Sequence, residues 1–154
     1  VIFTNPVPAL DAQELGFRKG ETFDKLMQSP FGSMLKSKFG SVDEILYQIN
    51  VNKKLEILPV SDIRGYDTGD DRTILYIPEA QNLTVYLMKL SLQRVAENCK
   101  VIVDGDVDQV DKSVYSYDNG MRRLSEIFRG SDLYGEVELQ TIYRSKIANL
   151  ADKL

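Results

Sequence analysis

The segment TILYIPEAQNLTVYLMKLSLQRVAENCKVIV, residues 73–103, decides the fold of this chain. Its two ends, residues 73–77 and 101–103, are apolar runs rich in isoleucine and valine, which is typical of buried strands. Between them, apolar residues from Leu83 to Val95 recur at helical spacing and predict a helix of about four turns. A strand, a helix and a strand within about 30 residues form a right-handed crossover whose two strands are parallel. The sequence therefore predicts an α/β fold with a mostly parallel sheet.

The segments on either side of this unit fit the same plan. Strands are predicted over residues 1–4, 55–59 and 136–140. Helices are predicted over residues 42–53, 120–128 and 145–154, with two short helices inside residues 21–39. Ser41 and Glu44 fit a capping box at the start of the helix over 42–53. Residues 5–20 and 64–71 carry glycines at short intervals and are predicted to be loops, the second of them mobile. We expect all of these elements to form a single domain over residues 1–154.

The composition narrows the class of protein. The 154 residues are 43% hydrophobic and 27% charged, which is the balance of a soluble globular protein. This balance excludes disordered, collagen-like and membrane-embedded chains. There are 19 basic and 23 acidic residues, so the net charge is −4. Because such a protein is not drawn to nucleic acid as a whole, any contact with nucleic acid must be local.

The counts of histidine and cysteine exclude several kinds of site. The chain has no histidine and one cysteine, Cys99. Ser-His-Asp triads, Cys-His triads, histidine metal sites and internal disulfides are therefore ruled out. The sequence contains neither a secretory signal nor a membrane-spanning stretch, so we expect a cytoplasmic protein. Because Val1 already stands in a segment that resembles a buried strand, we expect a fragment whose beginning is missing.

The polar residues that follow the two strands of the crossover suggest where a ligand binds. In an open parallel sheet, ligands bind beyond the carboxyl ends of the strands. Because neighbouring strands lie about 4.8 Å apart, pairing of the two strands would bring Glu79 into one crevice with Asp106 and Gln109. A carboxylate at such a place can orient an attacking water, and a carboxamide can sense the oxygens of a terminal phosphoryl group. The pattern favours a phosphate-binding site.

Two alternatives for the same acidic turn remain open. Asp104, Asp106 and Asp108 match the first three ligand positions of an EF-hand calcium loop. However, Gln109 and Tyr115 stand where that loop needs its glycine and its bidentate glutamate, and the run follows a strand instead of a helix. The other alternative is that the acidic side chains only solvate the ends of the strands.

Four motifs resemble those of a known family, and a fifth resembles a motif of related helicases. Residues 79–82 (EAQN) look like the Walker B motif D-E-A-Q-N of the PhoH-like P-loop ATPases, and residues 105–111 (GDVDQVD) are similar to their motif G-D-x-x-Q-x-D. Residues 15–20 (LGFRKG) and 63–65 (IRG) resemble the family segments L-G-F-x-x-G and I-R-G. Residues 142–145 (IYRS) are similar to the Y-R-S motif of superfamily-1 helicases. Each motif is short, so the specificity of the resemblance comes from their order and spacing.

The resemblance implies a function and a role for particular residues. It implies a RecA-like P-loop ATPase core, related to helicases, that lacks its first strand and P-loop. It also implies ATP and Mg²⁺ as ligands, RNA or another nucleic acid as a partner, and assembly as a homo-oligomer. Glu79 would be the general base, Gln109 the γ-phosphate sensor and Arg144 an arginine finger-like contact to the γ-phosphate. The resemblance also assigns Gln81, Gly105 and Asp106 to the nucleotide and Mg²⁺ region, and Arg64 to a substrate loop.

Two departures from the family pattern keep a second hypothesis open. A P-loop needs G-x-x-x-x-G-K-[ST] to cradle phosphates, and no Gly-Lys pair occurs in the 154 residues. Pro78 stands where the family has the aspartate that holds Mg²⁺, and proline offers no side-chain oxygen, so no metal ligand is assigned. As a separate chain, this sequence is not expected to hydrolyse ATP. The alternative is a catalytically degenerate nucleotide-binding fold that binds nucleic acid or a protein partner.

Overall fold

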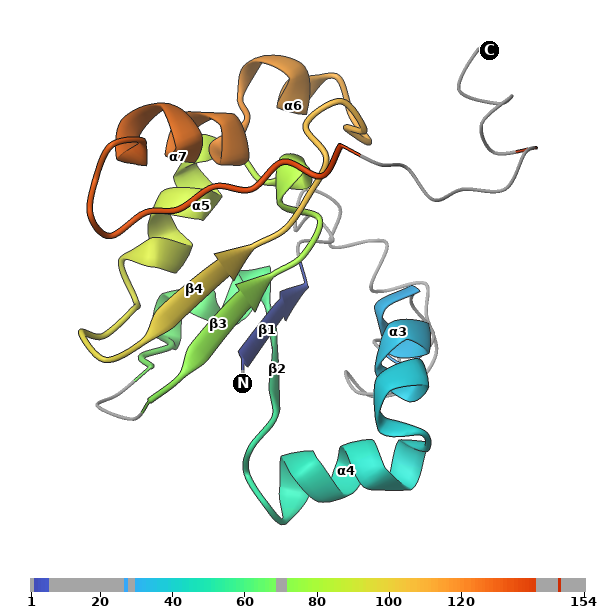
Figure 1. Cartoon of the computed structure of the whole chain (residues 1–154). Helices are drawn as coiled ribbons and strands as arrows, with labels where there is room; N and C mark the ends of the chain where they lie inside the picture. Colours follow the sequence, from blue (N-terminus) through green and yellow to red (C-terminus); the bar gives the residue numbers. More distant parts are fainter. Residues whose placement is uncertain (1, 6–26, 28–29, 69–71, 141–146, 148–154) are drawn as a thin grey trace. The chain divides into compact units, whose positions relative to one another are not determined.

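The computed structural model describes residues 2–5, 27, 30–68, 72–140 and 147 (Figure 1). The chain divides into two compact units, Val1–Leu124 and Ser125–Leu154. The first unit contains the sheet and all of the site residues that fall within the described part of the chain.

The first unit is built on a parallel sheet of four strands. The strands are β1 (Ile2–Asn5), β2 (Glu56–Pro59), β3 (Ile74–Ile77) and β4 (Lys100–Val103). Their order is β2-β1-β3-β4, and each neighbouring pair is parallel. β3 pairs with β4 from Ile74 opposite Lys100 to Ile77 opposite Val103. The predicted α/β class and the predicted parallel pairing of these two strands are thus confirmed.

Short helices connect the strands. The α-helices are α3 (Pro30–Phe39), α4 (Val42–Asn50), α5 (Val85–Leu92), α6 (Val114–Tyr117) and α7 (Gly120–Phe128). Two 3-10 helices are also present: η2 (Val60–Gly65) follows β2 directly, and η3 (Ala80–Asn82) begins three residues after the end of β3. No helix in the described part of the chain is both long enough and apolar enough to cross a membrane.

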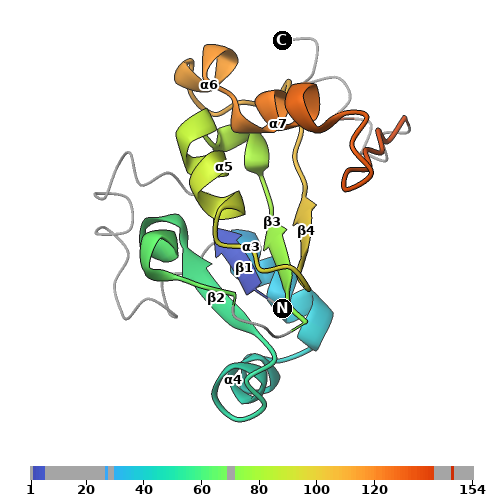
Figure 2. The same ribbon diagram turned by 90° about the vertical axis from the view of Figure 1, so that its left-hand side faces the viewer.

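The main core lies between the sheet and α5. Leu75 and Ile77 of β3 are almost completely buried, and they belong to one apolar cluster with Leu83 and Met88. Seen from the side, α5 lies beside β3 (Figure 2). Because Leu75 and Ile77 are two positions apart, they share one face of the strand, whereas Tyr76 between them is only half-buried. This alternation fixes which face of β3 meets α5.

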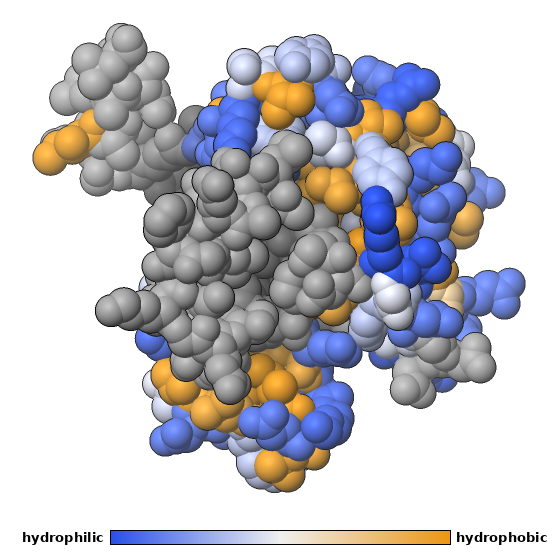
Figure 3. All heavy atoms as spheres, turned by 180° about the vertical axis from the view of Figure 1, so that it is seen from behind, coloured by the Kyte–Doolittle hydropathy of each residue, from blue (hydrophilic) through white to orange (hydrophobic). Residues whose placement is uncertain are grey.

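A second, smaller apolar cluster joins α3 to α4. Leu35 and Ile45 are buried at 1% and 0% exposure, and Gly40 ends α3 in a left-handed conformation with φ 82°. The predicted cap is present, because the Ser41 hydroxyl accepts a hydrogen bond from the Glu44 amide at 3.1 Å. The carboxylate of Glu44 accepts a bond from Gln48 instead of reaching back to the cap. Seen from behind, the surface at the α4 end of the molecule carries apolar side chains (Figure 3).

The helix of the crossover is shorter than its apolar spacing predicts. α5 has 8 residues, little more than two turns, where about four were expected. The Thr84 side chain accepts a hydrogen bond from the Leu87 amide and sets the start of the helix, so Leu83 stands before it. After Leu92, the Arg94 and Val95 amides donate to carbonyls three positions earlier, which is the spacing of a turn tighter than the α-helix. The apolar spacing therefore continues through residues that cover the core without being α-helical.

The predicted strand over residues 136–140 is wrong. This segment forms neither helix nor strand, although its residues alternate between polar and apolar. The side chains of Val137 and Leu139 are 86% and 85% exposed, and Glu136 accepts hydrogen bonds from Ser125 of α7 and from Tyr134. A strand needs a neighbouring strand to pair with, and the described part of the second unit contains none. The predicted helix over 145–154, except Ile147, lies outside the described residues, as do most of the predicted loop over 5–20 and the first helix of 21–39.

The predicted mobile loop over residues 64–71 is partly wrong. Its first residues, Arg64 and Gly65, form the end of η2, which packs against α5. Ile63, next to Arg64, is 1% exposed and belongs to the main core. Burial of this side chain anchors the turn, and the glycine-rich pattern of the segment gave no sign of it.

Candidate functional site

The candidate site is built where β3 and β4 end side by side. The Asp104 amide donates to the Ile77 carbonyl at 3.0 Å, and the Ala80 amide donates to the Asp104 carbonyl at 2.9 Å. The parallel pairing therefore continues beyond the last ladder pair, Ile77 and Val103. It brings the segment that follows β3 against the segment that follows β4. This is the juxtaposition that the strand pattern predicted.

The side chain of Gln81 joins these two segments. It is 2% exposed, and its Nε2 donates to Glu79 Oε2 at 2.8 Å and to the Gln109 carbonyl at 3.2 Å. Its Oε1 accepts from the Asp106 amide at 3.2 Å.

A Cβ at Gly105 would collide with Gln81 Oε1, so only glycine allows the backbone this close to the carboxamide. Gln81 and Gly105 are thus brought together with Glu79, Asp106 and the Gln109 backbone.

Glu79 occupies an unusual backbone conformation. Its φ of 52° and ψ of 38° lie in the left-handed region, which costs a non-glycine residue about 1–2 kcal/mol. The conformation is held on both sides, because the Glu79 carbonyl accepts from Asn82 at 3.0 Å and the next amide, that of Ala80, is bonded to Asp104. The Glu79 side chain is exposed. Strain of this kind clusters at functional sites, where the surrounding structure holds a side chain in a required position.

The turn after β4 is closed by Asp106. One oxygen of its carboxylate, Oδ1, accepts from the Asp108 amide at 3.0 Å, and Oδ2 accepts from Gln109 Nε2 at 2.6 Å. Arg122 of α7 donates to the Val107 carbonyl at 3.2 Å and so fixes the same turn from outside. The carboxamide of Gln109 is therefore bonded to Asp106.

The residue at the predicted Mg²⁺ position supplies no ligand in the described part of the chain. Pro78 is buried at the end of β3 and brings no side-chain oxygen. Both oxygens of the Asp106 carboxylate are used within the turn. Across residues 2–5, 27, 30–68, 72–140 and 147, no three histidine, cysteine, aspartate or glutamate side chains are grouped as metal ligands. This arrangement also gives no support to an EF-hand at Asp104, Asp106 and Asp108.

A second pair of polar residues ties the segments together further from the edge. Asn82 Nδ2 donates to Asp111 Oδ2 at 2.6 Å, and the Asp111 amide donates back to Asn82 Oδ1 at 2.9 Å. Asn119, which is buried, donates to the carbonyls of Gln81 and Tyr115, each at 3.1 Å. Asn82 and Asp111 belong to the quoted motifs, but the resemblance assigns them no role. Asn119 was missed altogether, although it directly precedes the predicted helix, where asparagine is a common cap.

Arg64 makes its contacts apart from this group. Arg64 is exposed on η2, where it donates to the Tyr86 hydroxyl at 2.7 Å and lies 5.8 Å from the centre of the Tyr86 ring. These contacts are therefore with α5 and not with Gln81 or the residues bonded to it. Arg144 lies outside the described residues.

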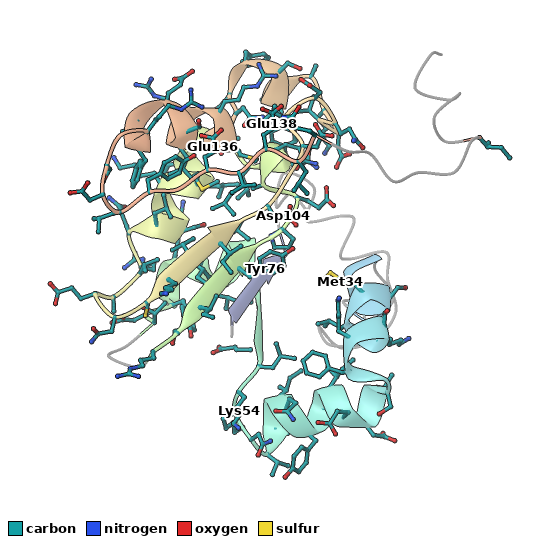
Figure 4. All side chains as sticks on the ribbon, viewed as in Figure 1. Met34, Lys54, Tyr76, Asp104, Glu136 and Glu138 are labelled. Atoms are coloured by element: carbon teal, nitrogen blue, oxygen red, sulfur yellow. The ribbon has the colours of Figure 1, made fainter. Side chains whose placement is uncertain are left out.

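One further contact shapes the electrostatics of this edge. The Tyr76 hydroxyl donates to Asp104 Oδ2 at 2.7 Å, and the two side chains lie next to each other at the ends of β3 and β4 (Figure 4). Burial of the phenol, followed by its hydrogen bond to Asp104, raises the pKa of Tyr76 to about 12. The phenol therefore stays protonated at neutral pH and remains a hydrogen-bond donor to the carboxylate.

Comparisons with known proteins agree with the motifs. A family model described as PhoH-like protein matches residues 1–153. Protein PhoH2 of Thermobispora bispora is 28% identical over 156 residues, which cover 100% of this chain and 35% of the relative. Protein PhoH2 of Bacillus subtilis is 33% identical over 150 residues, 92% of this chain and 33% of the relative. Protein PhoH of Escherichia coli K12 is 33% identical over 114 residues, 72% of this chain and 31% of the relative. The chain spans about a third of the length of these curated relatives.

Proposed function

The chain belongs to the PhoH-like family of P-loop ATPases. From this premise we propose that residues 1–154 are part of a RecA-like ATPase domain and supply the residues that promote attack of water on ATP, at the ends of β3 and β4. The proposed reaction is hydrolysis of ATP coupled to work on RNA or another nucleic acid. Proteins with this role often act as assemblies, so the proposal includes a homo-oligomer.

The observation that carries the proposal is the shared edge of β3 and β4. There the exposed carboxylate of Glu79 and the turn that bears Gln109 are joined through one buried carboxamide. We assign Glu79 as the general base that accepts a proton from the attacking water. Gln109 would donate its side-chain N–H to an oxygen of the γ-phosphate once it is released from Asp106.

The two arginines receive roles that extend the same proposal. Arg144 would stabilise negative charge on the γ-phosphate in the transition state. Arg64 is exposed and faces solvent from η2, where a guanidinium can contact the phosphates of a nucleic acid. The stacking of Arg64 over Tyr86 supports this role, because an exposed aromatic ring can also stack on an unpaired base.

Under this proposal, the P-loop that binds the phosphates of ATP lies outside these 154 residues. The sequence contains no Gly-Lys pair, and the described part of the chain offers no group of Mg²⁺ ligands. We therefore expect no ATP hydrolysis by the 154-residue chain alone. Hydrolysis is expected of the longest natural form of the protein, where a G-x-x-x-x-G-K-[ST] segment can hold the phosphates.

The test is the rate of ATP hydrolysis by that longest form with Glu79→Gln. Loss of a general base is expected to lower kcat by about 100-fold or more. Glu97→Gln, which removes an exposed carboxylate elsewhere in the first unit, is the matched control and is expected to turn over like the wild type. Unchanged turnover in Glu79→Gln contradicts the proposal.

One observation favours the degenerate alternative as a second candidate. Pro78 is buried where the family has its Mg²⁺-binding aspartate, so the chain could keep the fold and bind nucleic acid or a protein without hydrolysing ATP. Pro78→Asp in the longest form is then expected to switch hydrolysis on. Robust wild-type turnover that Glu79→Gln abolishes eliminates this candidate.

A further inference from the structure

Gln81 lies between the two groups to which the proposed function gives chemical roles. Its place in a Walker B-like motif suggested contact with the nucleotide or Mg²⁺. We propose instead that Gln81 is a positioning residue, which transmits the position of the Gln109 turn to the carboxylate of Glu79. This inference rests on the proposed function, because it assumes that Glu79 and Gln109 act on one phosphate.

The hydrogen bonds of the carboxamide leave no donor for a nucleotide. A glutamine side chain has two N–H donors on Nε2 and one carbonyl oxygen. Nε2 reaches Glu79 Oε2 at 2.8 Å and the Gln109 carbonyl at 3.2 Å, and Oε1 accepts from the Asp106 amide at 3.2 Å. One buried amide is thus shared between the proposed base and the backbone of the proposed sensor.

Burial, a hydrogen bond to its backbone and the close approach of Gly105 hold Gln81 in place. Its side chain is 2% exposed, and its backbone carbonyl accepts a hydrogen bond from the buried Asn119 at 3.1 Å. Gly105 lies so close to Oε1 that any side chain there would collide with it. The carboxamide therefore cannot swing away without a movement of the segments that follow β3 or β4.

This arrangement gives a physical route for coupling. The Gln109 side chain donates to Asp106 at 2.6 Å, while the Gln109 carbonyl accepts from Gln81. A phosphate that draws the side-chain carboxamide of Gln109 away from Asp106 would shift the backbone carbonyl of Gln109. Gln81, which donates to that carbonyl, would pass the shift to Glu79. The backbone of Glu79 is held in a left-handed conformation. The bond from Gln81 Nε2 to Glu79 Oε2 at 2.8 Å then sets the direction of the exposed carboxylate.

The experiment compares Gln81→Met with wild type in the longest natural form, by steady-state ATP hydrolysis. Methionine keeps the length of the side chain and removes all three hydrogen bonds. We expect kcat to fall about 10- to 100-fold, with KM for ATP changed by less than about 2-fold. Gln93→Met, at an exposed glutamine next to α5, is the matched control and should leave both values unchanged. Gln81→Leu, which removes the same three hydrogen bonds without adding a charge, gives the same expectation if the methionine variant does not fold.

The same substitution in a Glu79→Gln background separates this inference from the proposed function. If Gln81 acts through Glu79, Gln81→Met lowers kcat by less than about 2-fold in that background. A rise in KM with kcat unchanged would show direct contact with nucleotide and overturn the inference. An undiminished loss of kcat in the Glu79→Gln background would overturn it as well. If Glu79→Gln alone leaves turnover unchanged, the proposed function fails, and the inference fails with it.

Discussion

Two hydrogen-bond networks in this protein are each centred on one side chain, and they differ in burial. In the first unit, the neutral carboxamide of Gln81 is 2% exposed. In the second unit, the charged carboxylate of Glu136 accepts bonds from Ser125 at 2.8 Å, Arg129 at 3.0 Å and Tyr134 at 3.0 Å, but the Glu136 side chain is 43% exposed.

The difference predicts where stability and order are concentrated. A buried polar group that loses its partner cannot turn to water, so each broken bond carries a desolvation cost. An exposed ion pair that is broken is rehydrated and was already screened by salt. We therefore expect substitutions around Gln81 to lower the free energy of unfolding strongly and those around Glu136 to lower it little, although each of these side chains makes three or more hydrogen bonds.

The largest effect is expected from Asn119→Ala. This change removes the donor that serves the carbonyls of Gln81 and Tyr115, and it removes the oxygen that accepts from the Arg122 amide at the start of α7. The free energy of unfolding, measured with urea, should fall by about 3 kcal/mol. Asn98→Ala, at an exposed asparagine, should change it by less than about 0.5 kcal/mol. Similar losses in both variants would contradict the role given to the buried network.

A smaller loss is expected from Gly105→Ala. The new Cβ would collide with Gln81 Oε1 and would stand 3.0 Å from both the Ala80 nitrogen and Met121 Sδ. The cost of such overpacking is about 2 kcal/mol. The matched control is Gly135→Ala, because a Cβ there meets nothing within 4 Å. Thermal unfolding of the two variants tests the comparison, and an equally stable Gly105→Ala would show that the site has more room than its contacts indicate.

The edge of the sheet should also be sensitive to alkaline pH. The folded chain raises the pKa of Tyr76 from 10.0 to about 12, by burial and by the bond to Asp104. The neutral phenol is therefore favoured by folding, and its contribution is present below pH 10.0 and lost as the pH rises to about 12. Unfolding measured across this range should show a steeper loss of stability in wild type than in Tyr76→Phe. Parallel curves would mean that the phenol is not held by Asp104.

The smallest effect is expected from Glu136→Gln in the second unit. Hydrogen bonds from Ser125, then Arg129 and Tyr134, lower the pKa of the Glu136 carboxyl. The contribution of the charged form is therefore present above the ordinary carboxyl pKa and is lost as the pH falls through the lowered value. Because the group is exposed and screened, the melting temperature of Glu136→Gln at physiological salt should match that of wild type. A loss as large as that of Asn119→Ala would remove the distinction between the two networks.

The parts of the fold that the sequence predicted depend on local pattern and general topology. The apolar runs that became β3 and β4 could be read one at a time, and the rule for crossovers then made them parallel. The segment over 136–140 has an equally clear alternation, yet it is not a strand, because pairing depends on a neighbour that local pattern does not specify. The end of α5 was misplaced for a similar reason, since apolar spacing continues beyond the helix.

The candidate site shows the same limit at the level of side chains. The strand pattern located Glu79 and the Gln109 turn at one edge, because the carboxyl ends of paired strands must meet. They gave no direction for the Gln81 carboxamide, whose bonds to Asp106 and Gln109 connect residues 25 and 28 positions apart. They also gave no sign that Arg64 would be bonded to Tyr86, 22 positions along the chain. Hydrogen bonds between distant segments are set by the packed fold and leave little trace in spacing.

The central claim is that Glu79 and Gln109 act together on a terminal phosphate at the shared edge of β3 and β4. The most direct test is a crystal structure of the longest natural form with a non-hydrolysable ATP analogue. We expect the Gln109 carboxamide to leave Asp106 and donate to a γ-phosphate oxygen, with the Glu79 carboxylate hydrogen-bonded to a water that faces the phosphorus. An analogue bound elsewhere, with Gln109 still on Asp106 and Glu79 facing no phosphate, would contradict the claim.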